Sequence, residues 1–217
     1  MINSYFIFGL GFLAQGLFSA RLLVQWLLSE KAKKVVSPDI FWQLSIVASF
    51  LLLLYGILRK DIVLMGGQVV SYFIYIRNLH LNRNWNTMYP LFRWLIIGAP
   101  ILAFVLLIFN DSGYSLEDIV DNPDISLQLY TVGTIGQIIF TFRFVYQIIY
   151  SEKKQQSILP PMFWIISITG ALIIAGYAIE RRDPVIIIGQ LSGLLIYSRN
   201  LFLYYRSNMR EKKEINK

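Results

Sequence analysis

The sequence contains no cysteine and a single histidine, and these two shortages remove several kinds of chemistry. Without cysteine the chain has no disulfide, no thiol nucleophile and no thiolate metal ligand. His80 alone makes neither a metal cluster nor a Ser-His-Asp set, and no glycine-rich phosphate loop opens a soluble helix. We therefore expect a protein that is not an enzyme and that has no cofactor.

Charge is also scarce, at 15% of residues against 56% hydrophobic ones. A helix crosses a bilayer with about 20 consecutive apolar residues. Seven such segments are predicted: Tyr5–Leu28, Asp39–Leu58, Ile62–Leu81, Met88–Phe109, Leu127–Tyr150, Pro161–Ile179 and Pro184–Tyr205. The first has no basic leader and no small-residue cleavage site, so we expect it to be retained. The sequence predicts an all-α integral membrane protein with seven transmembrane helices.

Basic residues gather on one side of these segments. Alternate loops and the tail carry Lys31, Lys33, Lys34, Arg77, Arg83, Arg93, Lys153, Lys154, Arg206, Arg210, Lys212, Lys213 and Lys217. The other side carries Arg59, Lys60, Arg181, Arg182 and an acidic loop with Asp111, Glu117, Asp118, Asp121 and Asp124. Lys and Arg collect on the cytoplasmic side. We predict an external N-terminus and a cytoplasmic C-terminus, and this orientation explains the net charge of +7 without a nucleic-acid partner.

The chain repeats itself at an offset of 122 residues, which aligns Gly11–Leu81 with Gly133–Leu203 without a gap. Roughly a third of the aligned positions are identical, which indicates an internal repeat. Each repeat holds three predicted spans, and the odd linker span gives both repeats the same orientation. We expect two parallel three-helix repeats joined by a linker helix, with a central path between them. The predicted parts are residues 1–87, 88–126 and 127–217.

Polar residues recur inside the spans. At 100° per residue, those of the third span form one stripe, and the seventh span repeats it. The candidate ligand-binding residues are Arg21, Gln25, Gln68, Tyr75 and Asn78 in the first repeat and Arg143, Gln147, Gln190, Tyr197 and Asn200 in the second.

Arg21 lies about seven residues, or roughly 10 Å, inside its span. An unpaired charge at depth costs at least about 2.5 kcal/mol on insertion scales. Neither repeat offers a carboxylate nearby, since Asp61 and Asp183 stand at the opposite helix ends. A phosphate-bearing ligand would supply the counter-charge, because guanidinium pairs with phosphate through two hydrogen bonds.

A structural interpretation stays open. Arg21 can extend to lipid phosphate, and Gln25, Gln68 and Asn78 can hydrogen-bond neighbouring helices together. Trp42 and Trp164 are expected in the aromatic belt at the membrane interface.

The motifs Q-x5-R-x3-Q-x3-SEK, P-x2-FW and GQ-x6-Y-x-RN occur in both halves. Together they resemble the lipid A biosynthesis protein N-terminal domain family, which is distantly similar to SWEET and PQ-loop transporters in its 3+1+3 plan. The resemblance implies a role in envelope glycolipid metabolism at a bacterial inner membrane, often beside polyprenyl-phosphate glycosyltransferases. Some members are fused to a lipid A disaccharide synthase. We expect no such activity here, because the sequence contains no glycosyltransferase domain.

Three functions remain in view. The first is a transporter or flippase of a phosphate-bearing lipid, such as a polyprenyl-phosphate-linked sugar. The second is a SWEET-like carrier of small soluble sugars. The third is a non-transporting membrane subunit that docks a membrane glycosyltransferase. The sequence leaves open whether the chain forms a homo-oligomer.

Overall fold

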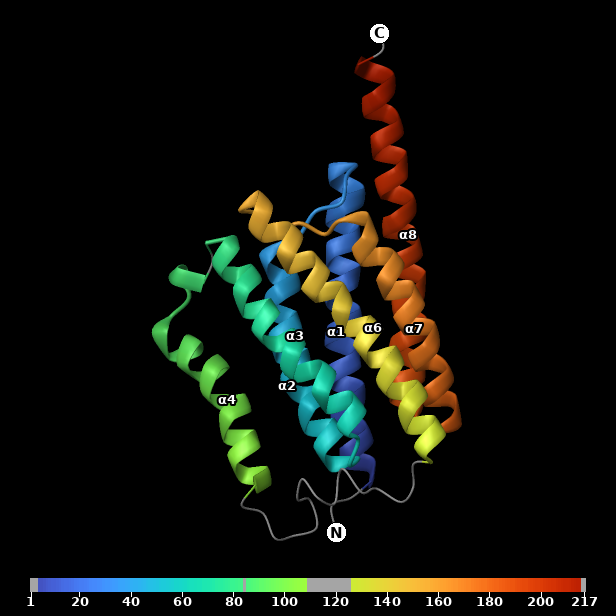
Figure 1. The fold of residues 1–217 in the computed structure, drawn as a ribbon. Helices are drawn as coiled ribbons and strands as arrows, with labels where there is room; N and C mark the ends of the chain where they lie inside the picture. The colour runs from blue at the N-terminus through green and yellow to red at the C-terminus, as the bar shows by residue number, and fades with distance from the viewer. Residues whose placement is uncertain (1–3, 84, 109–125, 216–217) are drawn as a thin grey trace.

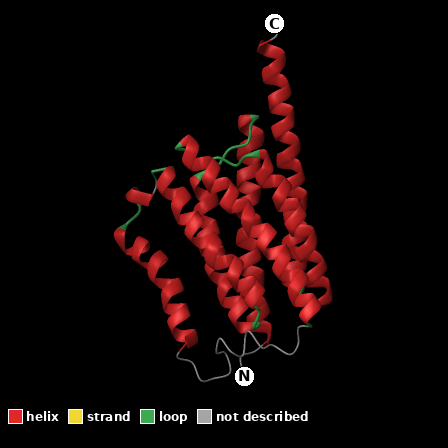
Figure 2. Cartoon of the chain, viewed as in Figure 1, coloured by secondary structure: helices red, strands yellow, loops and turns green. Residues whose placement is uncertain are grey.

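The structure is a computed structural model that describes residues 4–83, 85–108 and 126–215 (Figure 1). These residues form helices α1 (Ser4–Ala32), α2 (Asp39–Leu58), α3 (Ile62–Leu81), α4 (Pro90–Ile108), α6 (Leu127–Lys154), α7 (Pro161–Glu180) and α8 (Pro184–Ile215), with a short 3-10 turn at Trp85–Thr87. Within the described ranges there is no strand (Figure 2). The predicted acidic loop, the last residue of the linker span and the end of the tail lie outside them.

Six of these helices are long and apolar enough to cross a membrane, namely α1, α2, α3, α6, α7 and α8. This agrees with six of the predicted spans. α4 is also apolar but is not among these six. A seventh crossing by α4 therefore stays a prediction, as does the SWEET-like 3+1+3 arrangement.

The six long helices pack as a closed ring. α2 lies between α1 and α3, and α7 lies between α6 and α8. Two seams, α1–α8 and α3–α6, join the repeats to each other. α4 stands at the side of the ring near α2 and α3, and α8 continues past the other helices at the end that holds the C-terminus (Figure 1).

Short signals at the helix ends explain why the elements begin where they do. Asp61 precedes α3 and accepts a hydrogen bond of 3.0 Å from the backbone nitrogen of Leu64. Asp183 precedes α8 and accepts bonds of 3.0 and 3.2 Å from the nitrogens of Val185 and Ile186. A carboxylate at this position satisfies nitrogens that have no partner within the helix. The matching caps begin the third helix of each repeat in the same way.

The end of the bundle that holds both aspartates, here called the aspartate end, ties the repeats together. Tyr55 donates a hydrogen bond of 2.8 Å to Asp183, and Tyr177 donates one of 2.9 Å to Asp61. Arg181 lies 3.5 Å from Asp61. Both carboxylates are buried. Each repeat thus satisfies the buried aspartate of the other, which holds this end closed.

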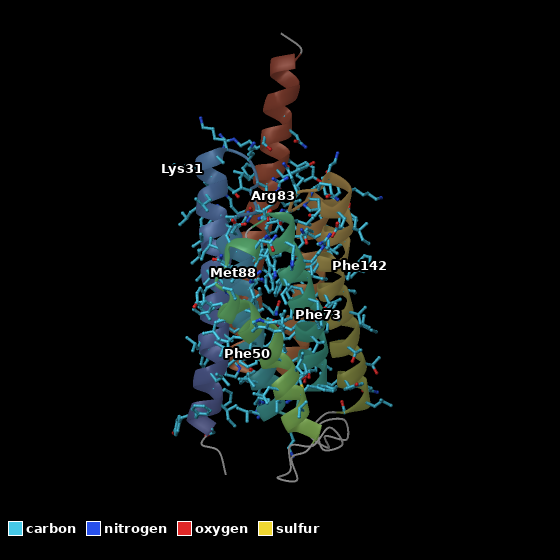
Figure 3. All side chains as sticks on the ribbon, turned by 90° about the vertical axis from the view of Figure 1, so that its left-hand side faces the viewer. Lys31, Phe50, Phe73, Arg83, Met88 and Phe142 are labelled. Atoms are coloured by element: carbon cyan, nitrogen blue, oxygen red, sulfur yellow. The ribbon has the colours of Figure 1, made fainter. Side chains whose placement is uncertain are left out.

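The opposite end, here called the basic end, carries the loops at Lys31 and Arg83 (Figure 3). There the hydroxyl oxygens of Ser37 and Ser157 lie 2.9 Å apart. Ser37 belongs to the loop between α1 and α2, and Ser157 belongs to the equivalent loop between α6 and α7. Equivalent loops of the two repeats therefore meet at the same end of the bundle.

Trp42 and Trp164 do not lie in an interfacial belt. Both indoles are 0% exposed. Their ring centroids lie 5.9 and 6.1 Å from those of Tyr75 and Tyr197. Trp42 and Trp164 stand in the first turn of α2 and α7, on the face turned to the ring interior, so the predicted belt role is wrong and these rings are core.

Candidate functional site

A small polar cavity of about 50 Å³ lies inside the ring, between the two repeats. Six predicted site residues line it: Arg21, Gln68, Tyr75, Arg143, Gln190 and Tyr197. A buried water needs roughly 10–15 Å³ by this kind of measure, so the cavity has room for a few waters. A phosphate group is of comparable size, whereas a sugar-bearing lipid is far larger. The cavity therefore has room for a group about the size of a phosphate and not for a whole lipid.

The two arginines of the cavity are each only 3% exposed. No ion pair joins either one to a carboxylate of the described residues. Aromatic rings surround them instead. The Cζ atom of Arg21 lies 4.5 Å from the centroid of Phe18, and Arg143 Cζ lies 3.3 Å from that of Phe140. The missing counter-charge that the sequence indicated is thus a feature of the described structure as well.

Phe144 stands beside both guanidinium groups. Its centroid lies 5.8 Å from Arg21 Cζ and 4.5 Å from Arg143 Cζ. The two positive charges therefore lie within 6 Å of one ring. The position equivalent to Phe144 in the first repeat is Leu22, so the cage is not fully symmetric.

Hydrogen bonds satisfy the guanidinium groups only in part. Arg21 Nη1 donates to the Ser45 hydroxyl, and Arg143 Nη1 donates to the Tyr197 hydroxyl at 3.5 Å. The Nε atoms of both arginines are buried and have no acceptor among the described residues. A charge at the bilayer centre costs about 2.5–3.5 kcal/mol, and a desolvated cation–π contact contributes about 2 kcal/mol. The rings offset much of the cost without removing the charge, so the site favours an anion.

The remaining four predicted residues lie outside the cavity, nearer the basic end, and are fully buried. Asn78 and Gln147 exchange two amide hydrogen bonds of 3.0 and 2.8 Å across the α3–α6 seam. Gln25 donates one bond of 3.0 Å to Asn200 across the α1–α8 seam. These amides face one another and hydrogen-bond the two repeats together. This is the arrangement that the structural interpretation of the sequence describes, in which amides hold neighbouring helices together. They form a buried layer between the cavity and the basic end.

The glycine of each GQ motif makes room for a glutamine of the other repeat. A Cβ atom added to Gly67 would lie 1.5 Å from Gln137 Nε2, and one added to Gly189 would lie 2.3 Å from Gln15 Oε1. Gln15 and Gln137 also line the cavity. The candidate residues chosen from the sequence did not include them. Gln15 and Gln137 are separated by the same 122 residues as Gly67 and Gly189. This shared offset is the signal in the sequence that pairs each glutamine with the glycine of the other repeat.

The geometry defines a multi-helix membrane protein whose two repeats enclose an aromatic-lined cationic cavity. The family description "Lipid A Biosynthesis N-terminal domain" matches residues 10–80 and 132–202. The chain belongs to this family, as its motifs predict.

Curated relatives share this resemblance over nearly the whole chain. A lipid-A-disaccharide synthase of Chlamydia pneumoniae is 30% identical over 207 residues, which cover 93% of this chain and 34% of that protein. The enzymes of the same name from Chlamydia felis (strain Fe/C-56) and Chlamydia trachomatis serovar D are 26% and 27% identical over 93% and 94% of this chain. The chain spans about a third of the length of these relatives. No solved structure matches it.

These names overturn one expectation. The sequence predicted a protein that is not an enzyme, but relatives that match 93% of the chain are named for an enzyme. The prediction was wrong because it judged catalysis by motifs within this chain, whereas the relatives are about three times as long.

Proposed function

We propose that the chain binds the phosphate group of a lipid in lipid A biosynthesis within the central cavity and moves that lipid across the membrane. The observation that carries the proposal is the pair of buried arginines, Arg21 and Arg143, whose Nε atoms have no acceptor and which have no carboxylate partner in the described residues. Guanidinium binds phosphate with paired, charge-assisted hydrogen bonds. A polyprenyl-phosphate-linked sugar is the cargo that we favour.

The repeat supports movement of the lipid rather than static binding. Polar contacts close both ends of the cavity: the Tyr–Asp pairs at the aspartate end and the buried amide layer towards the basic end. A phosphate held between two closures of this kind can be released to either side when one of them opens, as alternating access requires. The aspartate end is external and the basic end cytoplasmic in this proposal, in a bacterial inner membrane.

The test is native mass spectrometry of the protein purified with its lipids. The double variant Arg21→Gln, Arg143→Gln should lose a phosphate-lipid adduct by about tenfold or more, since charged hydrogen bonds contribute about 1.5–3 kcal/mol each. Lys31→Gln, Lys153→Gln is the matched control, because it removes two equivalent exposed cations. Equal adducts in wild type and the arginine variant would contradict the site.

Transport is scored separately, with fluorescent phosphatidic acid in reconstituted vesicles and an impermeant quencher. Wild type should bring lipid from the inner to the outer leaflet, and the arginine variant should not. Bound lipid without movement would leave the binding site in place and remove the transport part of the proposal.

A second candidate function follows from the relatives' name. The chain then serves a lipid-A-disaccharide synthase reaction as the membrane part that holds the lipid substrate for a glycosyltransferase. The match to about a third of each synthase supports this role. Co-purification with a glycosyltransferase, together with phosphate-lipid binding and no transport, would favour it over the carrier.

A further inference from the structure

The central cavity is too small for a lipid, so a bound lipid needs a place for its hydrocarbon chain. Two apolar grooves lie on the membrane-facing surface, one on each seam between the repeats. The α1–α8 groove has a volume of about 310 Å³ and is lined by Ser19, Leu23, Trp26, Ser192, Leu195, Ile196 and Arg199. The α3–α6 groove has a volume of about 330 Å³ and includes Gly67, Val70, Gln137 and Thr141.

Each groove shares residues with the cavity. Ser19 and Ser192 line both the cavity and the α1–α8 groove. Gln137 and Thr141 line both the cavity and the α3–α6 groove. The wall between the cationic cavity and the lipid-facing surface is therefore a single layer of side chains at either seam.

At the level of the cavity the two walls are packed alike. Gln137 packs against Gly67 across the α3–α6 seam, and Gln15 packs against Gly189 across the α1–α8 seam, so that a methyl group fits at neither glycine. One hydroxyl contact of 3.1 Å also joins Ser19 to Ser192 across the α1–α8 seam. A single hydroxyl hydrogen bond contributes only about 1 kcal/mol, so the difference in strength between the seams lies nearer the basic end.

The buried amide layer differs between the two seams. Asn78 and Gln147 exchange two hydrogen bonds, and Ser157 donates a third, of 2.7 Å, to Asn78 Oδ1. Gln25 makes one bond to Asn200, and Gln25 Oε1 is buried without a donor among the described residues.

The ion pairs near the basic end also make the α3–α6 seam the stronger one. Arg77 binds both carboxylate oxygens of Glu152, at 2.5 and 3.0 Å. Arg199 binds one oxygen of Glu30 at 2.7 Å, and Trp26 Nε1 donates to the same oxygen. Two-pronged arginine–carboxylate pairs are the stronger kind. The α3–α6 seam is thus the better bonded both in the amide layer and at the ion pairs.

We propose that the α1–α8 seam is a lateral portal, through which a phosphate-bearing lipid places its phosphate at Arg21 and Arg143 while its hydrocarbon chain lies in the α1–α8 groove. The α3–α6 seam stays closed and acts as the hinge. The occupant follows from the chemistry of the two joined spaces, because a cationic cavity beside an apolar groove fits one molecule with an anionic head and an apolar chain. This inference rests on the proposed phosphate-lipid site.

The chain has no cysteine, so paired cysteines can lock one seam at a time. Ser19→Cys with Ser192→Cys locks the portal. Arg77→Cys with Glu152→Cys, which replaces an ion pair between α3 and α6 outside the cavity, locks the other seam as the control. Each lock is closed by oxidation or by a short bifunctional thiol reagent, and the same molecules after reduction report on folding.

The measurement is uptake of fluorescent phosphatidic acid from phosphatidylcholine vesicles. With the portal locked before lipid is added, uptake should fall by about tenfold and return on reduction; locking after loading should slow release by a similar factor. The control lock should leave uptake unchanged. Equal uptake by the open and the locked portal would overturn the proposal, as would an equal block by the control lock.

Two further measurements, on the arginine variant and with inorganic phosphate, distinguish a failure of this inference from a failure of the proposed function. An unchanged uptake in the locked portal, together with loss of uptake in Arg21→Gln, Arg143→Gln, would remove the portal and keep the phosphate site. A wild-type chain that takes up no phosphatidic acid would overturn both. Inorganic phosphate that prevents loading of open and locked protein alike would identify a free anion as the ligand and overturn the lipid portal.

Discussion

Tyr55 of the first repeat donates a hydrogen bond of 2.8 Å to Asp183 of the second, and Tyr177 returns the equivalent bond to Asp61 at 2.9 Å. Both carboxylates are buried, and each also accepts backbone hydrogen bonds at the start of a helix. The two aspartates of these exchanged pairs therefore cap two helices, and the pairs close the aspartate end of the cavity.

Removing both tyrosine hydroxyls should destabilise the bundle. Tyr55→Phe with Tyr177→Phe leaves two buried carboxylates short of a donor, and hydrogen bonds to charged groups contribute about 1.5–3 kcal/mol each. The free energy of unfolding in mixed micelles measures the loss. Tyr89→Phe is the control, because its side chain is exposed. A double variant as stable as the control would contradict the closure.

Adjacent glycines of α3 should respond in opposite ways to the same change. Gly67→Ala places a methyl group against Gln137 and should cost about 1–3 kcal/mol, as overpacking does. Gly66→Ala meets nothing within 4 Å and should be neutral or stabilise the helix by up to about 1 kcal/mol. Unfolding in mixed micelles compares the two, and Gln137→Ala should rescue Gly67→Ala. Equal effects at the two glycines would argue against the contact.

The two seams should differ in their sensitivity to the loss of an asparagine. Asn78→Ala removes both exchanged bonds with Gln147 and the bond from Ser157, whereas Asn200→Ala removes one bond from Gln25. We expect Asn78→Ala to lower the free energy of unfolding by about 1–3 kcal/mol more than Asn200→Ala does. Thermal unfolding of the purified variants gives the comparison. An equal loss would remove one of the two arguments for a fixed α3–α6 seam.

The orientation can be read from single cysteines, since the chain has none of its own. An impermeant thiol label should modify Arg182→Cys in spheroplasts and should reach Lys154→Cys only after the membrane is broken. Both positions are exposed in the structure. The reverse pattern would place the basic end outside.

Much of the helix layout was predictable from local signals. Asp39–Leu58 and Ile62–Leu81 match the predicted ranges, because prolines and aspartates mark helix starts in a way that depends on the sequence alone. The face of the third span was predictable as well, since Gln68, Tyr75 and Asn78 recur at helical spacing. The recurrence at 122 residues indicated that both repeats contribute equivalent residues to the centre.

The contacts of these side chains with other helices were not predictable, because they depend on the axial position of one helix relative to its neighbour. Asn78 and Tyr75 are less than one turn apart, yet Tyr75 reaches the cavity while Asn78 meets Gln147 in the amide layer. Trp42 was misplaced for a similar reason. Hydropathy does not distinguish an aromatic ring at the membrane interface from one buried between helices at the same depth.

The exchanged aspartate contacts bear on the origin of the chain. A three-helix ancestor with one copy of this pattern would have held a buried aspartate and the tyrosine that bonds it at sites that cannot meet within one subunit, since in the present chain Tyr55 reaches Asp183 and not Asp61. Such a subunit would satisfy its own carboxylate only by associating with a second identical one. In the present chain the link between the repeats makes this pairing permanent, while equivalent positions such as Leu22 and Phe144 beside the arginines differ.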